Sequence, residues 1–219
     1  MCDWMSAIVS RTGEVYRLDF SDAHEDIRAF YGLKDKADHL VPVEYSPDNP
    51  DGPDNPDTYK LRVHECAEPA WWSEVAVSVE AKLRAILERC IIRDKRAIIG
   101  GGPWILAEGS YVEKATDARI IAVCGGTLNA FCGGTLNAFR GGTLNDFRVG
   151  TLNDFWGGTL NDFCGGTLNA FWGGTIPDSL KARLAASRKG AGHDERFLGR
   201  QVGGPGPVGA GAPASGSRC

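Results

Sequence analysis

Long hydrophobic segments and a strong net charge are both missing from this sequence. No stretch of about 18 apolar residues occurs, which argues against a membrane-spanning helix. The formal net charge is only −4, whereas proteins that bind nucleic acid through its phosphates usually carry a basic excess. The first residues, Met1 to Trp4, lack the basic start and long apolar run of a secretory signal. We therefore expect a cytoplasmic protein that binds neither membranes nor nucleic acid.

Residue patterns that would indicate catalysis or a metal site are also scarce. The seven cysteines are odd in number, and without an export signal reduced thiols are the preferred interpretation. His64 and Cys66 lie two residues apart on an expected strand and so share a face, where Glu65 or Glu68 could complete a metal site. Two ligands do not define a site, and we prefer ordinary packing. No pairing of a nucleophile with a base is recognisable, so we predict a non-enzymatic protein without metal or cofactor.

Residues 1–100 have the mixed pattern of a small α+β domain. Ser21-Asp22 offers a helix N-cap, with Glu25 three residues after Asp22 in capping-box position. Val79, Leu83 and Ile86 recur at spacings of three and four, which is typical of one apolar helix face. The expected elements are a hairpin over Ala7–Leu18, helices over residues 23–31 and 74–93, strands over Leu40–Tyr45 and Tyr59–His64, and a proline- and aspartate-rich loop over Ser46–Thr58.

Glycine is abundant, with 29 residues, and most of it belongs to an eight-residue repeat. Six consecutive octads carry the pattern Thr-Leu-Asn-x-Phe, and in five of them a glycine pair precedes it. The three octads before them keep an apolar residue in the leucine position, namely Trp104, Val112 and Ile120. Each octad alternates a turn signal with a short extended segment. The pattern predicts a mainly β solenoid over residues 101–180.

Two octads are expected to form one coil. A single octad cannot close around both a leucine and a phenylalanine, whereas two octads form a two-sided coil whose core fits the ~10 Å spacing of packed sheets. Three octads would form a triangular coil, and this alternative stays open. Both apolar side chains point inward only if the strand bends near the asparagine, whose amide can then form a ladder between coils. The second glycine is kept in all seven units from Gly126 to Gly174, while the first is replaced once, by Val149, so the second should hold a positive φ.

The sixth and eighth positions of the octad vary, which is typical of solvent-facing sites. Tryptophan and arginine, which are enriched in binding hot spots, recur at the eighth position. We expect Asp146 and Asp162 to be stacked neighbours, with Arg148 offsetting their repulsion. The candidate binding face consists of Asp146, Asp154 and Asp162 at the sixth position and of Arg140, Arg148, Trp156 and Trp172 at the eighth.

Both ends of a solenoid expose unpaired strand edges and need covering. We expect residues 1–100 to cap the first coil, and a short basic helix over residues 181–189 to cap the last. Self-association through the solenoid ends is the alternative use of these edges. Residues 190–219 are rich in glycine, proline, alanine and serine and are expected to be disordered.

The GGTLNAF and GGTLNDF units resemble the octapeptide-repeat β-solenoid proteins of phage and bacterial genomes. The resemblance covers residues 101–180 and implies a host cytoplasm if a phage encodes the chain. Hexapeptide and pentapeptide solenoids are similar, but the period differs, so their acyltransferase activity and gyrase inhibition do not carry over. An octad also resembles the repeat of trimeric phage needle β-helices, although their Val-x-Gly start is absent here.

The function predicted from these observations is a structural or protein-interaction solenoid with a protein partner. Three alternatives stay open. A regular row of Thr127, Thr143 and Thr159 could bind ice or another lattice. The small acidic excess of the repeats could mimic DNA, and a trimer could form a needle-like β-helix.

Overall fold

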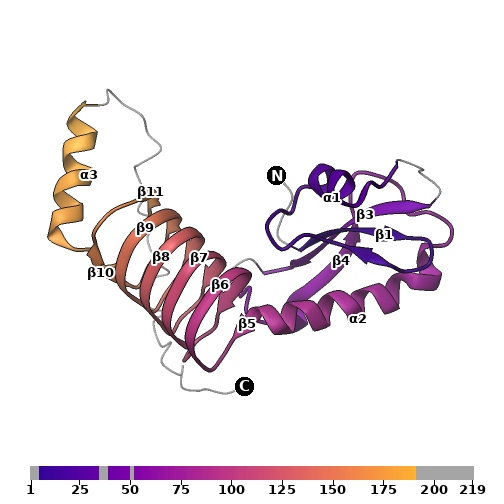
Figure 1. Ribbon diagram of the computed structural model, residues 1–219, viewed down its shortest axis with the longest axis horizontal. Coiled ribbons are helices and arrows are strands. Elements are labelled where there is room, and N and C mark those ends of the chain that lie inside the picture. Colours follow the sequence, from indigo (N-terminus) through magenta and orange to yellow (C-terminus); the bar gives the residue numbers. More distant parts are fainter. Residues whose placement is uncertain (1–4, 35–38, 50–51, 191–219) are drawn as a thin grey trace, which may run out of the picture.

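The computed structural model describes residues 5–34, 39–49 and 52–190, of which residues 185–190 are described by their backbone alone. An α+β region and a β-solenoid follow one another along the long axis of the molecule, and a helix covers the far end of the solenoid (Figure 1). The predicted fold class is therefore confirmed.

The N-terminal region contains an antiparallel sheet of strand order β2-β1-β3-β4. Ile27 of the first helix packs with Ile8 and Leu18 in a small cluster. Apolar residues of the second helix, among them Val79 and Leu83, pack in a larger one. The elements are β1 (Ser6–Ser10), β2 (Val15–Tyr16), α1 (His24–Tyr31), β3 (Leu40–Pro47), η1 (Pro56–Thr58), β4 (Tyr59–Val63) and α2 (Trp72–Cys90).

The predicted cap of α1 is wrong. The N-cap residue is Ala23, and no side chain caps the helix. The carboxylate of Asp22 instead accepts a hydrogen bond from the backbone N–H of Met5 at 3.2 Å and forms an ion pair with Arg119 of the solenoid. The Asp22 side chain is thus engaged with partners other than the helix terminus. Its ion pair with Arg119 links the N-terminal region to the solenoid.

Parallel strands spaced sixteen residues apart form a β-solenoid of about five turns over residues 91–171. Leu128 pairs with Leu144, and Leu144 pairs with Leu160. Two octads therefore make one coil, as predicted, and the three-octad alternative is excluded. The strands are β5 (Ile91–Ile92), β6 (Lys95–Leu106), β7 (Tyr111–Val123), β8 (Thr127–Phe139), β9 (Thr143–Phe155), β10 (Thr159–Phe163) and β11 (Thr167–Phe171).

Leucine and phenylalanine both point into the coil, which confirms the predicted bend of each strand. Leu144 and Phe147, for example, are completely buried. The phenylalanine rings stack in two columns whose neighbouring centroids are 5.0 to 5.7 Å apart. One column contains Phe131, Phe147 and Phe163, and the other contains Phe139, Phe155 and Phe171.

The second glycine has a positive φ, between +73° and +121°, in all seven octads from Gly126 to Gly174. Close approach of the next coil adds a second constraint. A Cβ placed on Gly150 would lie 2.7 Å from the carbonyl oxygen of Gly134. The first glycine is less constrained, as expected, although Gly133 has a φ of +127° beside the register shift where Cys132 faces Val149.

The asparagines form the expected ladders. On one side of the coil, the Nδ2 of Asn145 donates to Oδ1 of Asn129 at 3.0 Å, and Asn161 donates to Asn145 at 2.7 Å. Asn153 and Asn169 continue an equivalent ladder on the other side. At the bend of each strand, the asparagine amide therefore has a hydrogen-bond partner in the neighbouring coil.

Helix α3 (Asp178–Gly190) lies against the last coil. Leu180 is buried in the solenoid core, and Leu184 packs against it. The guanidinium of Arg183 lies 5.4 Å from the centre of the Phe163 ring. This end of the hydrophobic core is thus covered by apolar side chains, while the predicted disordered tail lies, from residue 191 on, outside the described residues.

Candidate functional site

The two-octad coil separates the variable positions into two outer sides. Because residues sixteen apart are stacked, alternate octads fall on the same side. We call the side formed by Ala138, Arg140, Asp154, Trp156, Ala170 and Trp172 the tryptophan face. We call the side formed by Ala130, Cys132, Asp146, Arg148, Asp162 and Cys164 the polar face. The predicted binding residues are therefore divided, four on the tryptophan face and three on the polar face.

Two exposed indoles dominate the tryptophan face. The rings of Trp156 and Trp172 stack with centroids 4.9 Å apart and an interplanar angle of 10°. Their exposed fractions are 48% and 42%. The Nε1–H of Trp172 donates to Oδ1 of Asp154 at 3.1 Å. The hydrogen bond and the stack together hold a flat apolar surface toward solvent, which is the kind of patch that marks an interaction site.

The tryptophan face continues a surface that is already covered at the first coils. Strand pairing aligns Ile105 with Ala122, Ala122 with Ala138, and Ala138 with Asp154. Ile105 and Ala122 are buried in a core shared with α2 and the N-terminal sheet. The N-terminal region therefore covers this outer surface at the first coils. From Trp156 on, the same surface is exposed to solvent.

Cys124 lies at the border between the covered and open parts of this surface. Burial is the main cause that raises the pKa of its thiol, to about 12, and the nearby carboxylate of Asp54 contributes further. The positive charge of Arg140 acts in the opposite direction. Asp54 belongs to the acidic loop, which is held here because its backbone oxygen accepts a hydrogen bond from Arg93 at 2.6 Å. Asp54 of the loop and Arg140 thus both act on the Cys124 thiol at the edge of the tryptophan face.

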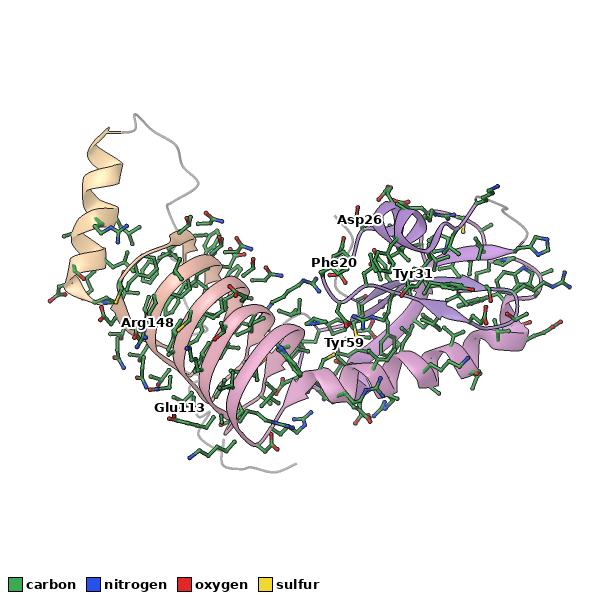
Figure 2. The ribbon with its side chains drawn as sticks, in the orientation of Figure 1. Phe20, Asp26, Tyr31, Tyr59, Glu113 and Arg148 are labelled. Carbon is green, nitrogen blue, oxygen red and sulfur yellow. The ribbon has the colours of Figure 1, made fainter. Side chains whose placement is uncertain are left out.

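The polar face is organised by ion pairing. Asp146 and Asp162 are stacked neighbours, as predicted. Arg148 forms an ion pair with Asp146, which offsets the repulsion between the two carboxylates. The thiol of Cys164 lies 3.5 Å from an oxygen of each carboxylate, and burial followed by these two contacts raises its pKa. Figure 2 shows Arg148 projecting from the outer side of the solenoid, and its charge is partly neutralised there.

The threonine row predicted for a lattice binder is in register. Thr127, Thr143 and Thr159 follow one another across adjacent strands. All three are half-buried. The row therefore has the regularity that a lattice binder requires.

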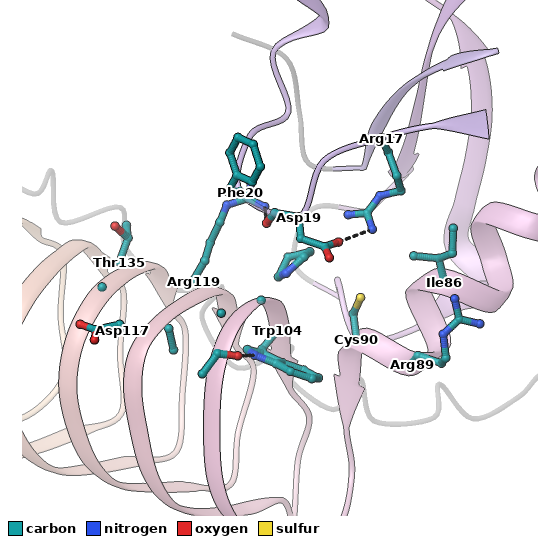
Figure 3. Close-up of a pocket in the computed structure, with 16 residues that line it drawn as sticks. Arg17, Asp19, Phe20, Ile86, Arg89, Cys90, Trp104, Asp117, Arg119 and Thr135 are labelled. Carbon is teal, nitrogen blue, oxygen red and sulfur yellow. Dashed lines mark hydrogen bonds and ion pairs between the residues drawn. The ribbon is translucent and has the colours of Figure 1, made fainter. Parts of the chain in front are cut away.

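An open pocket of about 1020 Å³ lies between the N-terminal region and the first coils (Figure 3). It is lined by the end of α2, the segment after β2, the glycine-rich corner of β6, and residues of β7 and β8. Its cationic side chains are largely engaged: Arg17 pairs with Asp19, and Arg119 pairs with Asp22. The sequence did not predict the pocket because its residues come from five separate segments.

The suggested sharing of a strand face by His64 and Cys66 is wrong. Strand β4 ends at Val63, and Glu65 adopts a left-handed conformation with a φ of +59°. The alternation of side chains therefore breaks at this point. Within the described part of the chain, the group of possible ligands at this position contains His24 together with His64 and Glu65, and not Cys66.

No protein-family model, curated protein or solved structure matches this chain. The resemblance to octapeptide-repeat proteins therefore stays a prediction. None of the helices in the described ranges combines the length and the apolar character that a membrane crossing requires.

Proposed function

We propose that this chain is a non-enzymatic protein-interaction module whose solenoid supports a binding surface on the tryptophan face. The observation that carries the proposal is the exposed stack of Trp156 on Trp172. The stack lies on the same outer surface that the N-terminal region covers at the first coils. A surface that packs against one apolar partner within the chain is suited to pack against a second one beyond it.

The rigidity of the face favours tight binding. Both indoles are fixed by stacking, and Trp172 is further held by its hydrogen bond to Asp154. Less side-chain entropy is therefore lost when a partner covers them. Arg140 and Asp154 flank the rings with charges of opposite sign, and such rim charges set the orientation of a partner. We infer a protein partner with an apolar patch bordered by polar groups.

A pull-down from the native host with the full chain as bait tests this proposal. The test variant is Trp156→Ala/Trp172→Ala, and the matched control is Asp162→Ala/Cys164→Ala on the polar face. We expect the control to retain the same proteins as the unmodified chain. The tryptophan variant should weaken their binding by more than about 30-fold, the effect of one hot spot of about 2 kcal/mol.

Equal retention by the tryptophan variant and the control would contradict the proposal. Three further measurements separate the alternatives. Thermal hysteresis would indicate lattice binding by the threonine row. Inhibition in a gyrase supercoiling assay would indicate DNA mimicry. A trimer in light scattering would indicate a needle-like assembly.

A further inference from the structure

We propose that His24, His64 and Glu65 form a binding site for a divalent transition metal ion, zinc in the first place. His24 is the first residue of α1, and the other two follow directly after β4. Ligand atoms of the three residues all lie within 4.8 Å of one another. The two imidazole rings have centroids 5.3 Å apart. The site lies in the N-terminal region and is independent of the tryptophan face.

The local backbone explains why neighbouring residues point to the same place. In a continuous strand, His64 and Glu65 would point to opposite faces. The positive φ of Glu65 breaks this alternation, and its Oε1 comes to 3.7 Å from Nδ1 of His64. The backbone N–H of His64 donates a 2.9 Å hydrogen bond to the carbonyl oxygen of Pro42, which holds the backbone of His64 beside β3.

Each imidazole ring has an oxygen acceptor close to its Nε2 atom, and two adjacent residues of β3 contribute these oxygens. Nε2 of His24 lies 3.2 Å from the carbonyl oxygen of Val43. A carbonyl oxygen only accepts, so this nitrogen carries the proton and Nδ1 of the neutral ring carries the lone pair. Nε2 of His64 lies 3.4 Å from Oε1 of Glu44. A carboxylate or carbonyl that orients the far nitrogen is the usual outer shell of a metal-bound histidine.

The other ring nitrogen of His64, Nδ1, gives independent evidence for a bound ligand. This atom is buried and has no hydrogen-bond partner among the described residues. A buried polar atom without a partner is costly unless a ligand satisfies it. This nitrogen lies beside the Glu65 carboxylate, where an ion bound to both atoms would satisfy it.

The ligand set selects the class of ion. Two imidazole nitrogens and one carboxylate are a common zinc set, in which a fourth position is left for water. The side chain of Glu65 is 68% exposed, so that fourth position faces solvent. Magnesium and calcium prefer oxygen ligands throughout and fit less well. The carboxylates of Glu44 and Glu65 together balance the two charges of the ion.

Zinc titration of the full, EDTA-treated chain by calorimetry tests the site. We expect one ion per chain. His64→Gln should weaken zinc binding more than a hundredfold, and Glu44→Gln, which perturbs only the outer shell, by about tenfold. The controls are His39→Gln, an exposed histidine outside the group, and Cys66→Ser, and both should bind zinc like the unmodified chain. Circular dichroism checks that each variant is folded.

Absence of zinc binding by the unmodified chain would overturn the proposal. So would an equal loss of affinity in His39→Gln or Cys66→Ser. His24 is only 5% exposed, so substitutions at the more exposed His64 and Glu65 carry the test without disturbing the core. Glu65→Gln should also weaken binding, because a neutral amide is a poorer zinc ligand than a carboxylate.

Cobalt substitution supplies a second readout that does not depend on affinity. Cobalt bound to nitrogen and oxygen ligands should show visible absorption without a thiolate charge-transfer band. The absorption should disappear in His64→Gln. A thiolate band would place the ion on a cysteine and overturn the assignment. Zinc should also raise the melting temperature of the unmodified chain but not of His64→Gln, because only a bound ion stabilises the folded state.

Discussion

The N-terminal sheet and the solenoid hold their strands together in different ways. Strands β1 to β4 pair antiparallel, and each buried residue meets different neighbours. In the solenoid, the pairing is parallel and most residues meet a copy of themselves, as Phe147 meets Phe131 and Phe163. A substitution within such a column is poorly accommodated, because identical neighbours on both sides determine the space around each side chain. The strict positions of the octad follow from this constraint, and the outward positions remain available for function.

The largest expected effect is at the centre of a phenylalanine column. Phe147→Ala removes a completely buried ring that stacks on both sides. We expect the free energy of unfolding to fall by about 3–5 kcal/mol. Phe171→Ala, at the end of the other column, removes a half-buried ring with one stacking partner and should cost clearly less. Urea denaturation measures both, and equal losses would contradict the column account.

A smaller loss of stability is expected when a glycine is replaced. Gly150 and Gly32 both have a positive φ. A Cβ on Gly150 would collide with the carbonyl of Gly134, whereas a Cβ on Gly32 would meet nothing within 4 Å. Gly150→Ala should therefore lower the free energy of unfolding by about 2–4 kcal/mol, and Gly32→Ala by about 1 kcal/mol.

A control lies next to Gly150. Val149 occupies the position of a first glycine, is exposed and does not have a positive φ. Val149→Gly should change the free energy of unfolding by less than about 1 kcal/mol. If thermal melts show small and equal shifts for Val149→Gly and Gly150→Ala, the second glycine is not the constrained one.

A pH dependence of stability is expected at the border of the two regions. The pKa of the Cys124 thiol is raised from 9.0 to about 12, mainly by burial. The folded state therefore favours the protonated thiol, and the associated stability is complete below the pKa of the unfolded thiol and is lost as the pH rises toward 12. Cys124→Ser removes this titration. The stability difference between the unmodified chain and Cys124→Ser should shrink between about pH 8 and pH 11, and a constant difference would contradict the assignment.

Most of the solenoid was predictable because the same structural constraints recur in several octads of the sequence. The spacing of Leu and Phe predicted the inward bend, and the lone Val149 identified the constrained glycine. The start of the solenoid was not predictable in the same way. Pairing begins at Ile91, ahead of Gly101, because the first coil uses residues such as Ile92 that do not follow the octad.

The candidate sites were predictable only where one repeat contains them. The row of Arg140, Trp156 and Trp172 follows from the coil size. The covering of its first coils by the N-terminal region does not, because that contact joins unrelated segments. The pairing of Asp22 with Arg119 and the group around His24 likewise depend on long-range packing that no local pattern records.

Hydroxyl-radical footprinting of the chain with its captured partner tests the central claim most directly. Trp156 and Trp172 report on the tryptophan face, and the exposed Cys164 reports on the polar face. We predict that the bound partner lowers oxidation of both tryptophans several-fold and leaves oxidation of Cys164 unchanged. Protection of Cys164 without protection of the tryptophans would contradict the account.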